Sequence, residues 1–407
     1  MRRKLFDFRE GLSDIYYIWR TEFLSIFKDR GVIILFFLVP LLYPLLYAYL
    51  YNEEVVYESK MVIVDQDNSD LSRAYIRMID ASAGVQVVGV TTNVNEARQS
   101  LWNKEAYAIA RIPKGFRKDI YQGKQTRVTF FSDLSSVLYY KNFMLTLNQA
   151  ALDLGRAYRL NHDIDKTGQP ALIQVQPVVN EDVSFFNPAG GYASFLLPVI
   201  LILIIQQTMV MGVSMLAATK RERSLHRELI PLISDRHYRG PMRIVFGKSV
   251  AYIMVYAVVC VWVLLAVPAI FDLPRMAHLG ELALFILPFL LACVFFSLFV
   301  SCFIFNREDS MLLIAFTSVI FVFLSGVTWP ETAMPEIWRW VSFLIPSTPG
   351  ARGMVALNTM GGGLEVVSNY HTILWMQAGG YLLFSSLGYA YLLRKQEKKL
   401  KDLDREI

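Results

Sequence analysis

Six long apolar segments without a charged residue constrain this chain more than any other feature of its sequence. A charged side chain is costly at the centre of a bilayer, and about 20 apolar residues in a helix cross its hydrocarbon core. The segments are residues 32–51, 192–218, 249–270, 282–305, 311–327 and 373–393. We therefore expect an α-helical membrane protein with six transmembrane helices.

Composition agrees with this expectation. Hydrophobic residues make up 54% of the 407 residues, and they occur in blocks instead of being spread as soluble cores require. The net charge of +5 lies mostly in short loops beside the blocks, so binding of nucleic acid is a poor interpretation. All three cysteines, Cys260, Cys293 and Cys302, fall inside apolar segments, which leaves the polar region without a disulfide.

The orientation follows from Lys and Arg, which stay on the cytoplasmic side of short flanks. Residues 220–248 carry eight Lys or Arg against three acids, and the tail after residue 393 carries six. The connections 271–281 and 329–349 each contain one arginine. We therefore expect a multi-pass protein of a bacterial cytoplasmic (inner) membrane, with both termini cytoplasmic and the polar region periplasmic or extracellular.

This orientation divides the chain into five parts. Residues 1–31 are expected to form a cytoplasmic interfacial helix with its basic residues toward lipid headgroups, or else a soluble helix that contacts a partner. The first transmembrane helix, 32–51, is followed by a mixed α/β extracytoplasmic domain at 52–188. Five transmembrane helices follow in 189–393, and 394–407 form a cytoplasmic tail. The helical part contains a cytoplasmic linker at 219–248 and an outer re-entrant hairpin at 328–350.

Strand-like and helix-like stretches alternate in the polar domain. The pattern predicts strands at 61–64, 85–90, 107–112 and 127–131, and helices at 71–80, 94–104 and after Pro113 as far as about Gly123. Asn93 or Asn95 would open the second of these helices. A longer helix is predicted from about residue 136 to residue 161.

Catalytic and nucleotide-binding motifs are hard to find. Gly247-Lys248-Ser249 ends like a phosphate-binding loop, but six residues instead of four separate Gly247 from Gly240, and an apolar segment follows at once. The histidines are scattered, without metal-ligand spacing. We expect no enzyme activity, no metal and no cofactor bound by this chain.

The uncharged segments also bear on the energy source. Carriers driven by ion gradients commonly place ionisable groups at mid-membrane, and this chain has none there. The polar candidates within the segments are Gln206, Gln207 and Gln377. They either join helices by hydrogen bonds or line a substrate path.

Two segments carry motifs outside the membrane. The linker is dense in charge, which suits an anchor at the membrane exit, although its interleaved acids also suit a surface that docks a soluble partner. Prolines and tryptophans of the segment after the fifth span suggest short helices that dip into the outer interface, or a plain aromatic belt. The residues of interest there are Gly326, Trp329, Pro330, Met334, Pro335, Trp338 and Pro346.

Taken in order, these motifs resemble the permease subunits of type 2 ABC exporters (the ABC-2 family), in the long form with an extracytoplasmic domain after the first span. The resemblance is most specific at 323–350, although Pro346-Ser347-Thr348-Pro349 has an extra serine. It extends to the linker at 221–228, where Leu225-His226 replaces the family's Gly-Thr. The outer-domain phrases Val64-Asp65-Gln66-Asp67 and Ile112-Pro113-Lys114-Gly115-Phe116 are also similar.

The resemblance implies that two permeases, identical copies or paralogues, form a dimer. Each linker would present a coupling helix to a separate ABC ATPase subunit, which binds ATP and Mg, and alternating access at the dimer interface would export an apolar or amphipathic substrate. A periplasmic adaptor and an outer-membrane channel are further candidate partners. The candidate ATPase-coupling residues are Arg221, Glu222, Arg223, Arg227 and Glu228.

The alternative interpretation is a membrane-anchored extracytoplasmic sensor or assembly scaffold. A receptor anchored by one span would need neither five further spans nor an outer hairpin. Co-purification separates the two, because an ATPase subunit indicates transport and a signalling enzyme indicates sensing. A gradient-driven carrier is a third alternative, which the uncharged segments disfavour.

Overall fold

The computed structural model describes residues 2–51, 57–122, 124–132, 137–163, 192–226, 240–273, 275–358 and 361–406. The chain divides into two compact units, which we describe separately. A helical unit comprises Met1–Glu54 and Ser184–Ile407, and an α/β unit comprises Val55–Val183.

The α/β unit contains a four-stranded sheet in the order β2-β1-β3-β4. Strand β1 (Ser59–Asp65) pairs in parallel with both β2 (Val85–Thr91) and β3 (Ala108–Ile112), and β3 pairs antiparallel with β4 (Thr129–Ser132). Helices join the parallel strands: α4 (Asp70–Asp80) follows β1 and α5 (Val94–Trp102) follows β2. The short α6 (Phe116–Tyr121) joins β3 to β4, and α7 (Val137–Asp163) follows β4.

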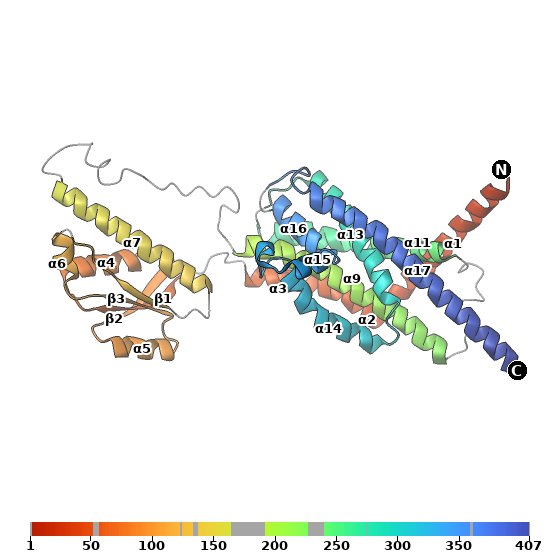
Figure 1. Ribbon diagram of the computed structural model, residues 1–407, viewed down its shortest axis with the longest axis horizontal. Coiled ribbons are helices and arrows are strands. Elements are labelled where there is room, and N and C mark those ends of the chain that lie inside the picture. Colours follow the sequence, from red (N-terminus) through yellow and green to blue (C-terminus); the bar gives the residue numbers. More distant parts are fainter. Residues whose placement is uncertain are drawn as a thin grey trace. The chain divides into compact units, whose positions relative to one another are not determined.

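Helices cover both faces of this sheet (Figure 1). On one face, Met61 and Ile63 of β1 pack with Tyr75 of α4 and Phe143 of α7. On the other face, α5 covers Val62, Val64 and Ile109. Caps fix the helix starts, because Ser69 and Ser72 form a reciprocal capping box on α4 and Asn93 accepts a hydrogen bond from the Asn95 amide at the start of α5.

The helical unit begins with α1 (Arg2–Ile26), α2 (Arg30–Ile33), the π-helical turn η1 (Ile34–Leu38) and α3 (Val39–Leu50). After the α/β unit come α9 (Tyr192–His226), α11 (Pro241–Val261), η3 (Trp262–Ala266), α12 (Val267–Ile270) and α13 (Leu279–Ser301). Next are α14 (Arg307–Leu324), the 3₁₀ turn η4 (Glu331–Ala333) and α15 (Glu336–Ser342). The unit ends with α16 (Ser347–Asn358) and α17 (Ser368–Glu406).

Within the described residues, four helical segments are long and apolar enough to cross a membrane: Arg30–Leu50, Ser194–Glu222, Pro241–Ile270 and Leu279–Ser301. They overlap the first four segments expected from the sequence over most of their length. The helices α14, which covers most of the fifth segment, and α17, which contains the sixth, are not among them. The 18-residue α14 begins with Arg307, Glu308 and Asp309, and α17 has polar and glycine residues among its apolar ones.

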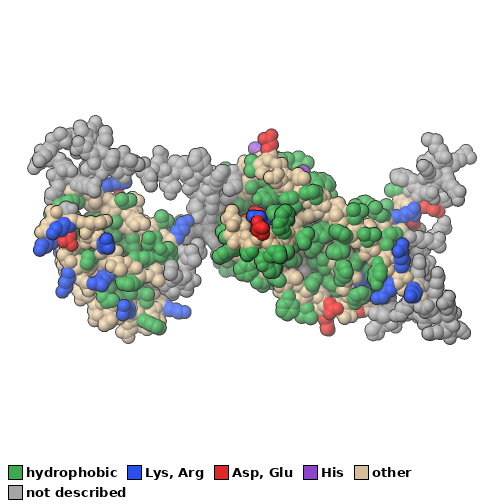
Figure 2. Space-filling view, viewed as in Figure 1, with side chains coloured by type: hydrophobic (Ala, Val, Ile, Leu, Met, Phe, Trp, Pro, Cys, Tyr) green, Lys and Arg blue, Asp and Glu red, His purple; other side chains and the backbone are tan. Residues whose placement is uncertain are grey.

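Large apolar side chains fill the core of this unit. Phe285 and Phe289 of α13 and Tyr252 and Tyr256 of α11 are fully buried or nearly so. Phe36 of η1 lies so close to α9 that a Cβ on Gly212 would be 2.0 Å from its ring. Figure 2 shows that hydrophobic side chains cover much of the visible face of this unit, while Lys and Arg gather at the end where Figure 1 places both chain termini.

Helical structure extends into both ends of the linker at 219–248. Helix α9 continues through His226, and α11 begins at Pro241, so both ends of that stretch are helical. The charged side chains there, Lys220 and Arg221 at one end and Lys248 at the other, have partners inside the protein.

Candidate functional site

Three acidic residues lie on the buried side of the N-terminal helix and the turn that follows it. Asp14, Glu22 and Asp29 are 7%, 0% and 6% exposed. The first two are eight residues apart and the last two are seven, close to two turns of an α-helix, so one side of this segment presents all three. A buried carboxylate is costly unless it is paired, and each of the three meets a base from another helix.

Glu22 lies between the two ends of the linker. Its carboxylate forms ion pairs with Lys220 of α9 and, at 3.4 Å, with Lys248 of α11, and it accepts a hydrogen bond from the Tyr252 hydroxyl. Burial raises the pKa of Glu22, but the two lysines and the hydrogen bonds outweigh burial and lower this pKa to about 2. Glu22 is therefore ionised throughout the physiological pH range.

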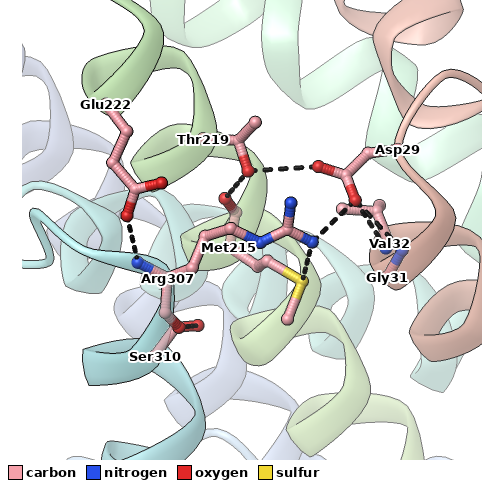
Figure 3. A network of polar contacts seen from close by, with 8 residues as sticks. All are labelled: Asp29, Gly31, Val32, Met215, Thr219, Glu222, Arg307 and Ser310. Carbon is pink, nitrogen blue, oxygen red and sulfur yellow. Dashed lines mark hydrogen bonds and ion pairs between the residues drawn. The ribbon is translucent and has the colours of Figure 1, made fainter. Parts of the chain in front are cut away.

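Asp29 joins three elements (Figure 3). It accepts hydrogen bonds from the amides of Gly31 at 3.0 Å and Val32 at 3.4 Å, which caps α2. Its Oδ1 pairs with Nη2 of Arg307 at 2.9 Å, and its Oδ2 accepts a hydrogen bond from Thr219 of α9 at 3.1 Å. The start of the first candidate span is thereby fastened to α9 and α14.

The third acid and two linker residues extend these contacts. Asp14 pairs with Arg243 at the start of α11 at 2.6 Å. Arg221 donates hydrogen bonds to the carbonyl oxygens of Ser301, at 2.8 Å, and Ile304, just after α13. Glu222 accepts one from the Arg307 amide at 2.8 Å. We call this whole set the linker network: Asp14, Glu22, Asp29, Thr219, Lys220, Arg221, Glu222, Arg243, Lys248, Tyr252 and Arg307.

Only part of the linker network was predicted from the sequence. Of the candidate coupling residues, Arg221 and Glu222 belong to it, Arg223 continues α9, and Arg227 and Glu228 lie outside the described residues. The three acids and their bases were missed. The seven- and eight-residue spacing of the acids was the available signal, because charges repeated every two helical turns share a face.

The same contacts change the expectation for the N-terminal helix. Its prediction as an interfacial helix considered the basic residues, whereas the structure packs α1 against α11 with its acids inward. Its exposed side carries apolar residues, among them Leu12 (52% exposed) and Tyr16, and the exposed Phe27 follows directly after the helix. Ring contacts run along the helix from Tyr16 through Trp19 and Phe23 to Phe27. The position of α1 at a membrane surface stays a prediction.

A second polar assembly, the hairpin network, holds the segment between α14 and α16. Gln206 of α9 accepts a hydrogen bond from the Ser347 amide at 2.5 Å, where α16 begins. Gln377 of α17 donates one to the Phe343 carbonyl at 2.6 Å, where α15 ends. These two glutamines thus satisfy backbone groups of helix ends, which have no partner within their own helix.

Arg352 of α16 occupies the centre of the hairpin network. Its side chain is 10% exposed, pairs with Glu331 at 2.7 Å, donates to the Ser325 carbonyl at 3.3 Å and lies over the Phe343 ring. Next to it, Gly326 has φ +90°, a conformation that favours glycine, and a Cβ at Gly326 would come within 3.2 Å of Arg352. The turn after α14 and the guanidinium therefore fit each other closely.

The remaining predicted hairpin residues lie at element boundaries. Trp329 donates a hydrogen bond to the Ala333 carbonyl, and Trp338 in α15 is 52% exposed. Pro330 and Met334 flank η4, Pro335 precedes α15, and the Pro346 carbonyl accepts from the Gly350 amide in the first turn of α16. Proline suits these positions because it fixes φ and has no amide hydrogen to lose.

Gln207 differs from its neighbour. Within the described residues, both polar atoms of its side-chain amide are buried and lack a hydrogen-bond partner. A buried amide without a partner is costly. Gln206 and Gln377 each keep one buried polar atom without a partner, Nε2 and Oε1 respectively, so Gln207 is the one of the three predicted candidates whose amide makes no hydrogen bond among the described residues.

The segment Gly247-Lys248-Ser249, which resembles the end of a phosphate-binding loop, is part of a helix. Gly247 and Lys248 both belong to α11, and Gly247 packs so closely on α1 that a Cβ there would lie 2.8 Å from Ile18. A phosphate loop needs free backbone amides around the anion. In α11 those amides belong to the helix, so the segment serves helix packing.

In the α/β unit, the two phrases that carried the resemblance meet at the carboxyl ends of β1 and β3. Asp67 accepts hydrogen bonds from the amides of Gly115 at 2.9 Å and Arg117 at 3.0 Å. Burial raises the pKa of Asp67, but hydrogen bonds from Ser69 and from the amides of Arg117, Gly115 and Phe116 outweigh burial and lower this pKa. The Asp67 carboxylate thus binds the backbone amides at the start of α6.

Comparison with known proteins identifies the family. The family model described as ABC-2 family transporter protein matches residues 30–387, which include most of both units. No curated protein matches the chain. The apolar helices and this match together lead to one conclusion: the chain belongs to the ABC-2 transporter family and is a multi-pass membrane permease of an ABC transporter.

Proposed function

We propose that the chain is the permease subunit of an ATP-driven exporter with six transmembrane helices, in which α14 and α17 supply the fifth and sixth. Both termini and the linker are cytoplasmic, and the α/β unit is extracytoplasmic. The distribution of Lys and Arg supports this orientation, because 220–248 and 394–407 are the basic flanks. The α/β unit then either gates release of the substrate or meets a periplasmic adaptor.

The linker at 219–248 transmits movement from a separate ABC ATPase, which binds ATP and Mg. One observation carries this proposal: the residues that open the linker, Lys220 to Glu222, hold α1, the end of α13 and the start of α14 by ion pairs and hydrogen bonds. Because these side chains are bonded to other helices, the linker cannot move by rearranging its own side chains alone. It pulls on several helices at once.

Helix α9 carries the displacement further. Gln206 in the hairpin network and Glu222 in the linker network lie on this one helix, about 24 Å apart at 1.5 Å per residue. An α-helix held at both ends behaves as a stiff connector. Movement of the linker therefore changes the hairpin, and in a dimer of two permeases this opens and closes an apolar path for an apolar or amphipathic substrate.

A fluorescence experiment tests transmission without knowledge of the substrate. Ile337 of α15 is 71% exposed, and the three native cysteines are buried, so a dye on Ile337→Cys reports on the hairpin alone. In the complex with its co-purified ATPase, ATP should change the dye signal. Simultaneous replacement of Glu222, Arg223 and Glu228 by Ala should abolish this change while ATP hydrolysis and membrane insertion persist.

Glu308→Gln provides the matched control, because Glu308 is exposed on the first turn of α14 beside Arg307. It should keep the full ATP-dependent signal. An unchanged signal in the triple variant would reduce the linker to a membrane anchor. ATP hydrolysis by the purified permease alone, without the ATPase, would defeat the proposal as a whole.

Cysteine labelling tests the orientation. Asn103 in the α/β unit and Lys28 after α1 are both exposed. With a membrane-impermeant maleimide on cells with a permeabilised outer membrane, Asn103→Cys should react at once. Lys28→Cys should react only after the inner membrane is opened. The reverse pattern would place the α/β unit in the cytoplasm.

A further inference from the structure

The N-terminal helix has ion-pair partners at both ends of the linker. Lys220, near the first residue of the linker, and Lys248, its last residue, pair with the same carboxylate, that of Glu22. Arg243, also near the end of the linker, pairs with Asp14 eight residues earlier on α1. The first residues of the linker belong to α9 and its last residues belong to α11. Helix α1 therefore binds the linker at both of its ends.

Asp29 extends this pattern beyond the linker. It follows α1 directly and pairs with Arg307 at the start of α14, while Glu222 of the linker binds the backbone amide of the same Arg307. The acids of the N-terminal segment thus hold bases of α9, α11 and α14. In these four ion pairs the acids lie on the N-terminal segment and the bases lie on the helices around it.

We propose that α1 is a positioning arm of the coupling apparatus, in which Asp14, Glu22 and Asp29 bind the bases at the two ends of the linker and at α14 and so set where the linker stands. This inference rests on the proposed function, because it assumes that the linker receives the ATPase. The three acids are positioning residues. They act through the linker and touch no substrate or nucleotide.

Burial makes the arrangement specific. Glu22 is fully buried and Lys248 is 7% exposed, so neither can exchange its partner for water without a large desolvation cost. Without the Glu22 carboxylate, Lys220 and Lys248 would face each other as like charges in a buried site. Their repulsion would drive the two ends of the linker apart.

Two variants, each of which replaces one glutamate by glutamine, test the positioning role of Glu22. The measurement is amide hydrogen exchange of the full-length permease in lipid nanodiscs. Glu22→Gln should speed amide exchange at least fivefold in residues 215–222 and 243–252. Glu308→Gln, an exposed acid outside the network, should leave these rates within twofold of the native protein. Equal rates in the two variants would overturn the proposal, whether or not an ATPase partner exists.

A charge swap tests positioning against simple loss of structure. In the complex with its co-purified ATPase, Asp14→Arg and Arg243→Asp should each lower the ATP-dependent signal of the dye on Ile337→Cys at least fivefold, while ATP hydrolysis continues. The double variant with both changes should restore the signal to within twofold. Failure of the swap to restore it would overturn the positioning role of this pair.

The two proposals can fail separately. If no ATPase co-purifies and ATP leaves the native dye signal unchanged, the proposed function fails, while the exchange experiment still reports on the acids of α1. If the native complex responds to ATP and Glu22→Gln responds equally, the arm is refuted and the exporter stands.

Discussion

Arg352 of α16 and Glu331 of η4 form an ion pair of 2.7 Å beneath the turn at Gly326. Arg352 is 10% exposed and Glu331 is 34% exposed, so the pair is partly shielded from water. Because Arg352 also binds the Ser325 carbonyl and lies over Phe343, one guanidinium joins the end of α14, the turn η4 and the end of α15.

We expect Glu331→Gln to destabilise the protein by about 1–3 kcal/mol, since it leaves a buried guanidinium without its counter-charge. Thermal unfolding of the solubilised chain should show a lower midpoint. Glu336→Gln is the control: Glu336 is 84% exposed and pairs with Arg339 only at 3.7 Å, so its loss should cost less than about 0.5 kcal/mol. Equal midpoints for both variants would contradict the importance of the buried pair.

The contact between η1 and α9 makes a second prediction. Gly212→Ala should destabilise by about 1–3 kcal/mol, because its Cβ would lie 2.0 Å from the Phe36 ring. Gly379→Ala on α17 meets no atom within 4 Å and should be neutral or stabilising by up to about 1 kcal/mol. The same thermal measurement checks both, and a stable Gly212→Ala protein would show that the first span packs less closely than described.

The pH dependence of the α/β unit follows from Asp67. Its folded pKa lies below the ordinary value of 3.8, so its contribution to stability is fully present above that value and is lost as pH falls through the lowered pKa. We expect exchange of the Gly115 and Arg117 amides to accelerate when pH falls below about 4, after correction for the intrinsic pH dependence of exchange.

Asp67→Asn should show the faster exchange already at pH 7 and lose the acid-dependent increase. The control is Asp70→Asn, which removes only an exposed pair with Arg117 and should behave as the native protein. An acid response that survives Asp67→Asn would assign the effect to another carboxylate.

The core of the α/β unit supplies the last prediction. Phe143 of α7 is fully buried against the sheet, so Phe143→Ala should cost about 3–5 kcal/mol. Phe131 of β4 is 42% exposed, and Phe131→Ala should cost much less. Denaturant unfolding monitored by hydrogen exchange in β1 and β3 separates the two. Similar losses would mean that α7 contributes little to this core.

Local patterns were enough to predict the α/β unit. The strand expected at 61–64 lies within β1, and the helix expected at 71–80 coincides with α4 apart from its first residue. Period-two and period-3.6 patterns of apolar residues produce these elements, and the caps at Ser69 and Asn93 limit them. Sheet order was not predicted, because it depends on contacts between distant strands.

The linker network was the larger omission. Arg221 and Glu222 were recognised because they lie in a dense run of charge, whereas Asp14 and Glu22 are single acids in a helix whose basic residues were expected to face lipid headgroups. Their importance depends on bases more than 190 residues away, such as Lys220 and Arg243. Sequence spacing shows that the acids share a face, but only the fold shows what that face meets.

The contact between α16 and α13 limits how the hairpin can move. Gly350 and Gly353 are three residues apart, and a Cβ on either would lie within 3 Å of the ring of Phe289 or Phe285. The two rings therefore sit in notches of the α16 surface. Rotation of α16 about its own axis would drive a turn of backbone or a larger side chain into these rings. We therefore expect α16 to keep its orientation against α13 whenever the hairpin moves.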